Sequence, residues 1–474
     1  MSLRLLWRRL NGNERGFALV MAIGIIVVLA IIGVTLASYS VSNLRATSHA
    51  TGSQRAFALA EAGLNNAAGI LSTAGNDPTN ASLLPSAASP RIDTAEGGTV
   101  SYWGSYNAAA RIWTVTGKGT VRNPNQASSI VRTITQQYSV NSVPSWKYIY
   151  MDNPNGCLSL ANTVQITQPL FVRGSLCMDN SSMVTSSASP VTVGGTIQTN
   201  NSASVGTSGS HLAVLHIGGG CRYGTSGSFV TPCTSAHHVY ADSQDGTIDS
   251  SITKAPIDLA LWYANAKPGP SNNCTTGSFP GGFDNDTTLN HSRAAVDLLP
   301  ASAYDCVFSS GGTTVGRIAW TPGSPGTLIV QGTIFFDGDI NLSGQAKAVY
   351  TGRAAIYSSG TVTIGNSTQL CGAYLSGACD WNAWNPDVNL LVIIAGSTTV
   401  APDFTLSQSG MFQGGAYAAT DFTEGNTARQ QGPIQANNIT LSNPGQTGYP
   451  GQASVPYGAP GGAVVAPVGG TWAG

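Results

Sequence analysis

The sequence opens with an apolar run that is too long and too uniform for an ordinary surface helix. Between Phe17 and Ala37 it reads FALVMAIGIIVVLAIIGVTLA, and no charged residue occurs from Gly16 to Leu44. A helix of this length can cross the roughly 30 Å hydrocarbon layer of a bilayer. Basic residues precede the run, namely Arg4, Arg8, Arg9 and Arg15. They predict a single-pass protein with its N-terminus in the cytoplasm and its C-terminal bulk translocated.

A cleaved secretory signal is the alternative, but its apolar region would span only about 7–15 residues. Here the helical pattern continues, because apolar residues recur at three- and four-residue steps from Val41 to Leu71 among sparse charges. Turn-forming residues at 75–78 end the pattern. The sequence therefore predicts one helix over 17–74, on the order of 85 Å long. One half would lie in lipid or against copies of itself, and the other on a globular head.

The junction Glu14-Arg15-Gly16-Phe17, the apolar run and the segment 56–64 (AFALAEAGL) carry a family resemblance. Together they resemble the N-terminal region of PilX-type minor pilins of type IV pili and, more distantly, GspK-like minor pseudopilins of type II secretion. The resemblance covers about the first 75 residues. It implies a leader peptide over 1–16, cleavage by a prepilin peptidase between Gly16 and Phe17, methylation of the new N-terminus, and other pilin subunits as partners.

One position departs from that family. Most pilins have Glu at the fifth mature position, where it neutralises the terminal amine of a neighbouring subunit, and an unpaired charge in an apolar core is costly. Here the fifth position is Met21. A subunit without this acid suits a filament tip or the priming of assembly better than a repeating shaft. The alternative is drift at a non-essential position in a membrane protein that never polymerises.

The rest of the chain reads as β-structure. Alternating, β-branched segments at 99–103, 111–116 and 129–135 predict a pilin-like antiparallel sheet within 75–143. Over 144–442, short apolar triplets followed by Gly, Asn or Ser recur every ten to twenty-five residues. This pattern predicts a parallel β-solenoid (β-helix), with a β-sandwich as the rival. The expected fold class is mainly β with a long N-terminal α-helix.

Two further segments stand apart. The stretch from about 206 to 325 breaks the triplet pattern and holds a short helix candidate at 257–266, so we expect a disulfide-rich insertion there. The segment 443–474 is rich in Gly, Pro and Ala and predicts a flexible tail.

Eight cysteines, an even number, fall in sequence-local couples. Export favours disulfides over free thiols, although eight cysteines permit 105 pairings. The neighbouring couples are Cys157 and Cys177, Cys221 and Cys233, Cys274 and Cys306, and Cys371 and Cys379.

Charge limits the possible partners. Only 9% of residues are charged and the net charge is -1, whereas ordinary soluble domains carry about 25%. Phosphate backbones require concentrated Lys and Arg, so nucleic acid is an unsuitable partner. Such a hydroxyl- and amide-rich surface is typical of exported β-proteins.

Few motifs in the sequence indicate a catalytic or metal-binding site. The acid pairs Asp337/Asp339 and Asp284/Asp286 lie in turn-like sequence, where Asp commonly bonds the backbone. They are weak calcium candidates and weaker catalytic ones. Cys221, Cys233, His237 and His238 have donor types that zinc accepts, but a disulfide with surface histidines is the simpler interpretation. No nucleophile motif, P-loop or dinucleotide fingerprint occurs. We therefore expect neither enzyme activity nor a cofactor.

Three functions fit these observations. The first is a minor pilin-like structural component of a type IV pilus or related assembly, tip-located or priming, that displays a β-rich adhesive domain at the cell surface. The second is a stand-alone membrane-anchored adhesin in the bacterial cytoplasmic membrane. The third is a polysaccharide-active enzyme on a pilin-type anchor. A surface or glycan is the expected ligand of the exterior domain.

Overall fold

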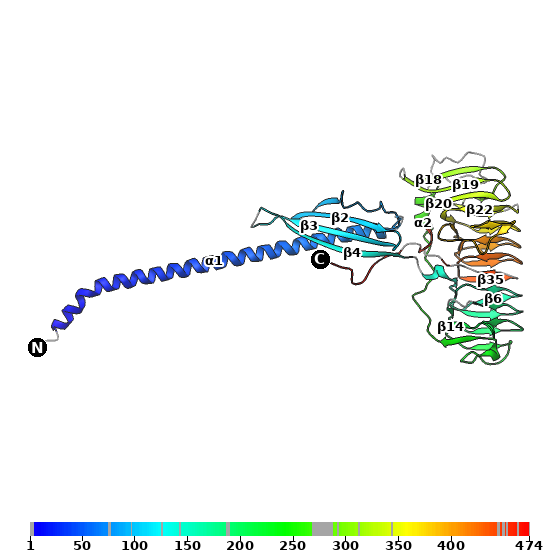
Figure 1. Cartoon of the computed structure of the whole chain (residues 1–474), viewed down its shortest axis with the longest axis horizontal. Coiled ribbons are helices and arrows are strands. Elements are labelled where there is room, and N and C mark those ends of the chain that lie inside the picture. Colours follow the sequence, from blue (N-terminus) through cyan, green and yellow to red (C-terminus); the bar gives the residue numbers. More distant parts are fainter. Residues whose placement is uncertain are drawn as a thin grey trace. The chain divides into compact units, whose positions relative to one another are not determined.

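The computed structural model describes residues 4–73, 77–95, 97–124, 127–141, 144–185, 190–267, 288–291, 293–310, 313–342, 345–442, 446–447, 451, 454–461 and 464–473. The chain forms two compact units, one of 1–71, 81–138 and 467–474, the other of 72–80 and 139–466. The first unit combines a long helix with an antiparallel sheet, and the second is built from mostly parallel sheets (Figure 1). The expectation of a long N-terminal helix followed by β-structure is confirmed at this level.

The helix α1 (Arg4–Ser72) is continuous. It ends close to the predicted residue 74 but begins earlier, within the segment predicted as a leader. The C-terminal part of the helix buries one face. Its buried residues are spaced four and three positions apart, which places their side chains on the same side of a helix. The buried residues of this face are Ala56, Ala60, Leu64, Ala67 and Leu71.

The first unit's sheet has the order β1-β2-β3-β4-β37. Its strands are β1 (Arg91–Ala95), β2 (Gly98–Asn107), β3 (Ile112–Val121), β4 (Ile130–Asn141) and β37 (Val464–Pro467). Neighbours β1–β2 and β2–β3 pair antiparallel, and alternate residues such as Val100, Trp113 and Val115 are buried. Figure 1 shows the C-terminal part of α1 running along β2, β3 and β4. The predicted strands at 99–103, 111–116 and 129–135 fall on β2, β3 and β4 to within one residue, while β1 and β37 were not foreseen.

Two glycines in β3 permit unusually close packing of α1 on this sheet. A Cβ added at Gly117 would collide with the carbonyl oxygen of Ala60, and one added at Gly119 with the carbonyl oxygen of Ala56. Backbone therefore lies directly against backbone, with small alanines on the helix side. Any side chain at these positions would push the helix away from the sheet.

The second unit repeats a pattern of three short strands. The first strand of each repeat pairs in parallel with the first strand of the next, and the second and third strands do the same. Thus β5 pairs β8, β6 pairs β9, and β7 pairs β10. The side chains that alternate inward form one continuous apolar core, as Leu158 and Leu160 do on either side of exposed Ser159.

One sheet collects the first strands. In order they are β16 (Ala241–Asp245), β14 (Leu212–Ile217), β11 (Val191–Val193), β8 (Leu170–Val172), β5 (Ile149–Met151), β34 (Ile434–Ala436), β31 (Gly415–Ala418), β28 (Leu390–Ala395), β23 (Arg353–Ser358) and β20 (Gly326–Phe336). The order turns at β20 into β22 (Lys347–Thr351), β25 (Gln369–Cys371), β30 (Met411–Gln413) and β33 (Arg429–Gln431). An antiparallel pair, β18 (Tyr304–Ser310) and β19 (Thr313–Thr321), joins at β20.

Two further parallel sheets collect the other strands. The second strands are β15 (Cys221–Tyr223), β12 (Ile197–Thr199), β9 (Ser175–Met178), β6 (Cys157–Ala161), β35 (Asn438–Ser442), β32 (Asp421–Glu424), β29 (Phe404–Leu406), β24 (Val362–Ile364), β21 (Gly338–Leu342) and β17 (Arg293–Val296). The third are β13 (Ser204–Val205), β10 (Met183–Val184), β7 (Gln165–Ile166) and β36 (Gln446–Thr447). The strands β26 (Tyr374–Leu375) and β27 (Ala378–Cys379) form a separate two-stranded antiparallel sheet. Outside all the sheets lie α2 (Leu259–Ala266) and the 3-10 turns η1 (Pro144–Lys147) and η2 (Ser235–His237).

The paired repeats form one continuous stack of strands, and the first of these strands along the chain, β5, lies in its middle. The chain runs from β5 to one end at β16, passes through the connection 246–292, and returns from the opposite end to β34. There β34 pairs β5, with Ile434 opposite Ile149, and β35 pairs β6. We call these two pairings the seam. Figure 1 shows it as orange β35 beside teal β6. Two arms that are far apart in sequence thus form one stack.

Two predicted segments differ from the structure. The expected insertion at 206–325 is not separate, because β14–β16 and β18–β20 belong to the stack, whereas the described residues 246–267, between β16 and β17, lie outside the three sheets. The expected flexible tail at 443–474 contributes β36 and β37. Its segment 454–460 is also held in place, since Trp146 Nε1 donates to the carbonyl of Pro460 at 2.6 Å. The Gly-, Pro- and Ala-rich composition indicated flexibility, but backbone groups in this segment are hydrogen-bonded in strands and to Trp146.

One acid lies in the apolar core. Glu424 is fully buried on β32, between Leu406 of β29 and Leu441 of β35 in the same row of paired residues. Burial raises the pKa of Glu424 well above its ordinary value, and the backbone N–H of Gln430 offsets this only in part. The folded state therefore favours the neutral carboxylic acid.

We expect Gly119→Val to lower the free energy of unfolding by about 1–3 kcal/mol, the usual cost of forcing atoms into a closely packed contact. Denaturant unfolding followed by tryptophan fluorescence measures the change. Gly69→Ala is the matched control, because no atom lies within 4 Å of the position of its added Cβ and alanine favours helix. An unchanged midpoint for Gly119→Val would contradict the close helix–sheet packing.

We expect Glu424→Leu to raise stability by about 1–3 kcal/mol near neutral pH, because it removes a buried polar group from an apolar row. As pH rises above about 4.3, the unfolded chain loses this proton while the folded chain keeps it, so wild-type stability falls. The gain should therefore grow between about pH 5 and pH 8. Glu424→Gln should abolish the pH dependence of the free energy of unfolding while still leaving a polar side chain buried in the core. A gain independent of pH would show that Glu424 is not held neutral.

Candidate membrane-spanning and assembly surface

The N-terminal part of α1 exposes apolar side chains on every side. By length and composition α1 can cross a membrane, and none of its most apolar stretch is buried. The exposed large residues are Leu19, Val20, Met21, Ile23, Ile25, Ile26, Val27, Val28, Leu29, Ile31, Ile32, Val34, Leu36, Tyr39, Val41 and Leu44. We call residues 18–44 the apolar rod. A contiguous apolar surface of this extent must be covered by lipid or by protein.

The hydroxyl of Thr35, within the most apolar part of the rod, is satisfied inside the helix. Thr35 Oγ1 donates to the carbonyls of Ile31 and Ile32, at 3.0 and 2.8 Å. Such back-bonding within the helix is what a hydrocarbon environment requires. Gly24 leaves an open notch between Met21, Ile25, Val28 and Leu29, where a neighbouring helix can approach closely.

Burial begins abruptly at Gly52, where a Cβ would meet the side chain of Ile130. Next to it, Arg132 donates through its guanidinium to Ser53 Oγ at 2.7 and 2.9 Å. From Ala56 onward the buried face of α1 packs on the sheet. One helix therefore has two environments, an apolar rod and a segment docked on the sheet.

The processing residues predicted from sequence lie on this helix. Gly16 and Phe17 fall within α1, although their side chains are outside the described residues. Met21, where the sequence resemblance leads one to expect an acid, is 59% exposed on the rod.

Three of the expected cysteine pairs are disulfides in the structure: Cys157–Cys177, Cys221–Cys233 and Cys371–Cys379. Cys306 is also disulfide-bonded, and Cys274 lies outside the described residues. The first bridge joins adjacent strands β6 and β9.

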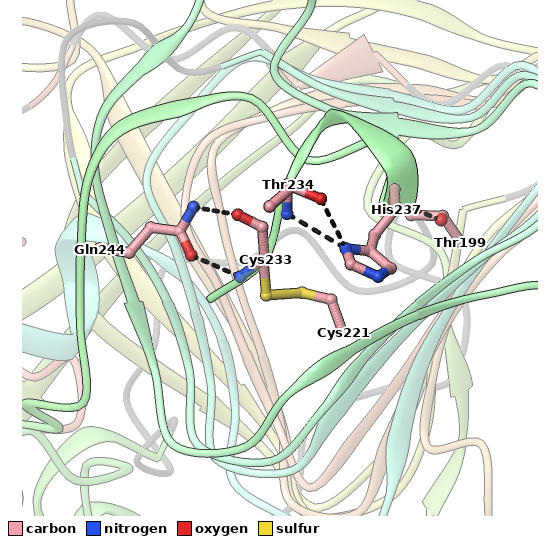
Figure 2. The surroundings of a disulfide bond; sticks show 6 residues. All are labelled: Thr199, Cys221, Cys233, Thr234, His237 and Gln244. Atoms are coloured by element: carbon pink, nitrogen blue, oxygen red, sulfur yellow. Dashed lines mark hydrogen bonds between the residues drawn. A yellow bond between two sulfur atoms is a disulfide. The ribbon is translucent and has the colours of Figure 1, made fainter. Parts of the chain in front are cut away.

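Cys221 and Cys233, two of the four residues considered as zinc ligands, are joined to each other in a disulfide (Figure 2). His237 Nδ1 is hydrogen-bonded to Thr234 and lies 3.1 Å from both the backbone N and the Oγ1 of Thr234. His238 packs on Tyr223 instead. The Gln244 side chain brackets Cys233, accepting from its N–H at 3.0 Å and donating to its carbonyl at 2.7 Å. These residues close one end of the stack.

The two weak calcium candidates are occupied by protein donors. Asp337 is buried and accepts hydrogen bonds from the backbone N–H groups of residues 290 and 291 and from Ser359 Oγ. Asp339 accepts from the backbone and hydroxyl of Thr361. Within the described ranges no group of three or more His, Cys, Asp or Glu side chains is arranged to hold a metal. Asp284 and Asp286 lie outside those ranges.

A cluster around Lys254 was missed by the sequence analysis. Lys254 Nζ donates to the carbonyl of Ala419 and to Asn437 Oδ1, both at 2.9 Å, and lies 4.9 Å from the centre of the Tyr417 ring. Burial lowers the pKa of Lys254 to about 8, although Asp403 and, more weakly, Asp152 and Asp421 oppose the shift. Lys254 lies 165 residues from Ala419 and 183 residues from Asn437 in the sequence, so no local pattern could have indicated this cluster.

Asp403 lies beside this cluster and is fully buried. Its carboxylate accepts from Thr420 Oγ1 and the Asp421 N–H, each at 2.8 Å, and from the Thr420 N–H at 3.2 Å. Burial raises its pKa. The carbonyl of the same Thr420 accepts from the backbone N–H of Asn437 at 2.7 Å, so Asp403 and Asn437 are held by one residue.

Comparisons with known proteins give one likeness to report. No family model and no curated protein matches the chain. The crystal structure of the competence-associated pilin ComZ from Thermus thermophilus is similar at 13% identity, covering 89% of this chain and 97% of that one, with a TM-score of 0.46. A likeness this distant does not by itself establish a shared fold or function.

Proposed function

We propose that this protein is a minor pilin-like structural component of a type IV pilus or related filament or secretion assembly. The apolar rod would anchor it in the bacterial cytoplasmic membrane, N-terminus inside, before assembly. Its β-rich units would lie on the extracellular side. The observation that carries the proposal is one uninterrupted helix that is wholly exposed and uncharged over 18–44 and docked on a sheet from Ala56 onward.

The rod suits a bundle of equivalent helices. From Ala18 to Ala37 its exposed side chains are apolar on all sides apart from Thr35, so this stretch can exchange lipid contacts for contacts with other pilin subunits. The notch at Gly24 gives a place for close approach. The resemblance of residues 14–17 to a pilin processing junction supports cleavage by a prepilin peptidase between Gly16 and Phe17.

We further infer that the three-strand repeats are coils of a parallel β-solenoid, and that this solenoid binds a surface rather than catalysing a reaction. Its second-strand sheet carries an outward column of hydroxyls, paired in register along the stack. The column consists of Thr363, Thr405, Thr423, Thr440 and Ser159. Hydroxyls repeated at the strand spacing of about 4.8 Å form a regular, uncharged surface suited to a glycan or another repetitive ligand.

We expect the mature protein to begin at Phe17 with a methylated N-terminus. Mass spectrometry of the protein isolated from membranes measures this, and Gly16→Val should leave the leader attached. A product that begins beyond residue 44 and is free of the membrane would contradict the proposal, because the rod would then be a discarded signal.

We expect Met21→Glu to spread the protein along filament shafts. The resemblance implies that an acid at this position pairs with a neighbour's amine, so restoring it removes an obstacle to repeated incorporation. Immunogold labelling should show wild type at tips or bases and Met21→Glu along shafts, with Met21→Gln behaving as wild type. Wild-type label confined to the cell body, away from filaments, would instead favour the stand-alone adhesin.

A further inference from the structure

We propose that Lys254 and Asn437 are joined by an intramolecular isopeptide bond. The amine and the side-chain amide already touch, with Nζ at 2.9 Å from Oδ1. They come from separate segments 183 residues apart. Both side chains are half-buried, and an amine held against an amide carbonyl has the proximity that makes such an attack effectively unimolecular.

The surroundings hold both partners still. The residue after the lysine, Ala255, is fixed from two sides: its N–H donates to Gln435 Oε1 at 3.0 Å, and its carbonyl accepts from Tyr417 Oη at 2.7 Å. Asn437 is fixed through its backbone by Thr420. Gln435 and Tyr417 are both buried. The two reacting groups therefore meet in an arrangement set by the stack.

The chemistry balances without an oxidant or a cofactor. The lone pair of neutral Lys254 Nζ attacks Asn437 Cγ, and the Nζ–Cγ bond forms. The Cγ–Nδ2 bond then breaks, and Nδ2 leaves as ammonia with one proton that came from Nζ. The product is a secondary amide that retains Oδ1.

The electrostatics support this step. Only the deprotonated amine has a lone pair, and burial moves the pKa of Lys254 down to about 8, so a substantial neutral fraction exists near physiological pH. Among the carboxyl groups acting on this lysine, Asp403 has the strongest effect. The Asp403 carboxylate is itself hydrogen-bonded by Thr420 and Asp421, so it acts on Lys254 through its charge.

The bond would secure the place where the stack is otherwise held only by hydrogen bonds and packing. Lys254 belongs to the connection that follows β16, and Asn437 lies in the turn between β34 and β35. Both β34 and β35 form the seam. The link would therefore tie the connection to the arm that closes the seam, through a covalent bond that reduction cannot break.

Peptide mapping tests the proposal. The full-length protein is purified from membranes in detergent, its disulfides are reduced and alkylated, and it is digested with trypsin. We expect a branched peptide containing Lys254 and Asn437, lighter than the sum of its parts by one ammonia. Recovery of the two tryptic peptides only as separate linear chains would overturn the proposal.

Variants separate the bond from folding. Lys254→Arg keeps a charged donor but cannot form the amide, so the branched peptide should vanish. Lys347→Arg is the control, because Lys347 Nζ donates to the carbonyl of Gly377 in a different part of the stack, and this variant should leave the branched peptide intact. A branched peptide that persists in Lys254→Arg would show that another residue is linked.

Discussion

A helix surface that is apolar on all sides cannot remain in water, and this constraint organises the first unit. The rod at 18–44 has neither a charge nor a buried side chain, so lipid or other helices must cover it. The same helix becomes one-sided where it meets the sheet. There, glycines replace side chains so that the helix backbone lies against β3. The sheet is thereby fixed to the end of a membrane-compatible helix that continues without a break from the rod into the docked segment.

The second unit solves a different problem. A parallel stack with open ends exposes unpaired strand edges. Here the chain begins in the middle of the stack, so neither end coincides with the start of the repeats at Ile149. One end carries the antiparallel pair β18–β19, and the other carries the Cys221–Cys233 bridge with its capping turn. The seam between β34 and β5 then becomes the place where two arms must stay together. The link proposed between Lys254 and Asn437 lies beside it.

The sequence predicted local features better than long-range ones. The rod, the strands of the antiparallel sheet and the alternation of buried residues follow from short periodicities, and each was found close to its expected place. The cysteine couples were also correctly paired where the structure describes them, because each spans only 8 to 20 residues. The seam could not be foreseen, since its strands are nearly 300 residues apart and look like any other repeat. The Lys254 cluster was missed for the same reason, and Asp337 and Asp339 proved to be bonded by backbone and hydroxyl groups.

The central claim is that the rod is retained and runs without a break into the docked segment. Spin labels carried by unnatural amino acids at Leu36 and Gln54, five helical turns apart, test it in native membranes by electron paramagnetic resonance. The account predicts a narrow distance distribution centred near 27 Å, from a rise of about 1.5 Å per residue. A broad distribution would contradict it by showing a hinge, and the absence of any paired signal would contradict it by showing that the rod has been removed.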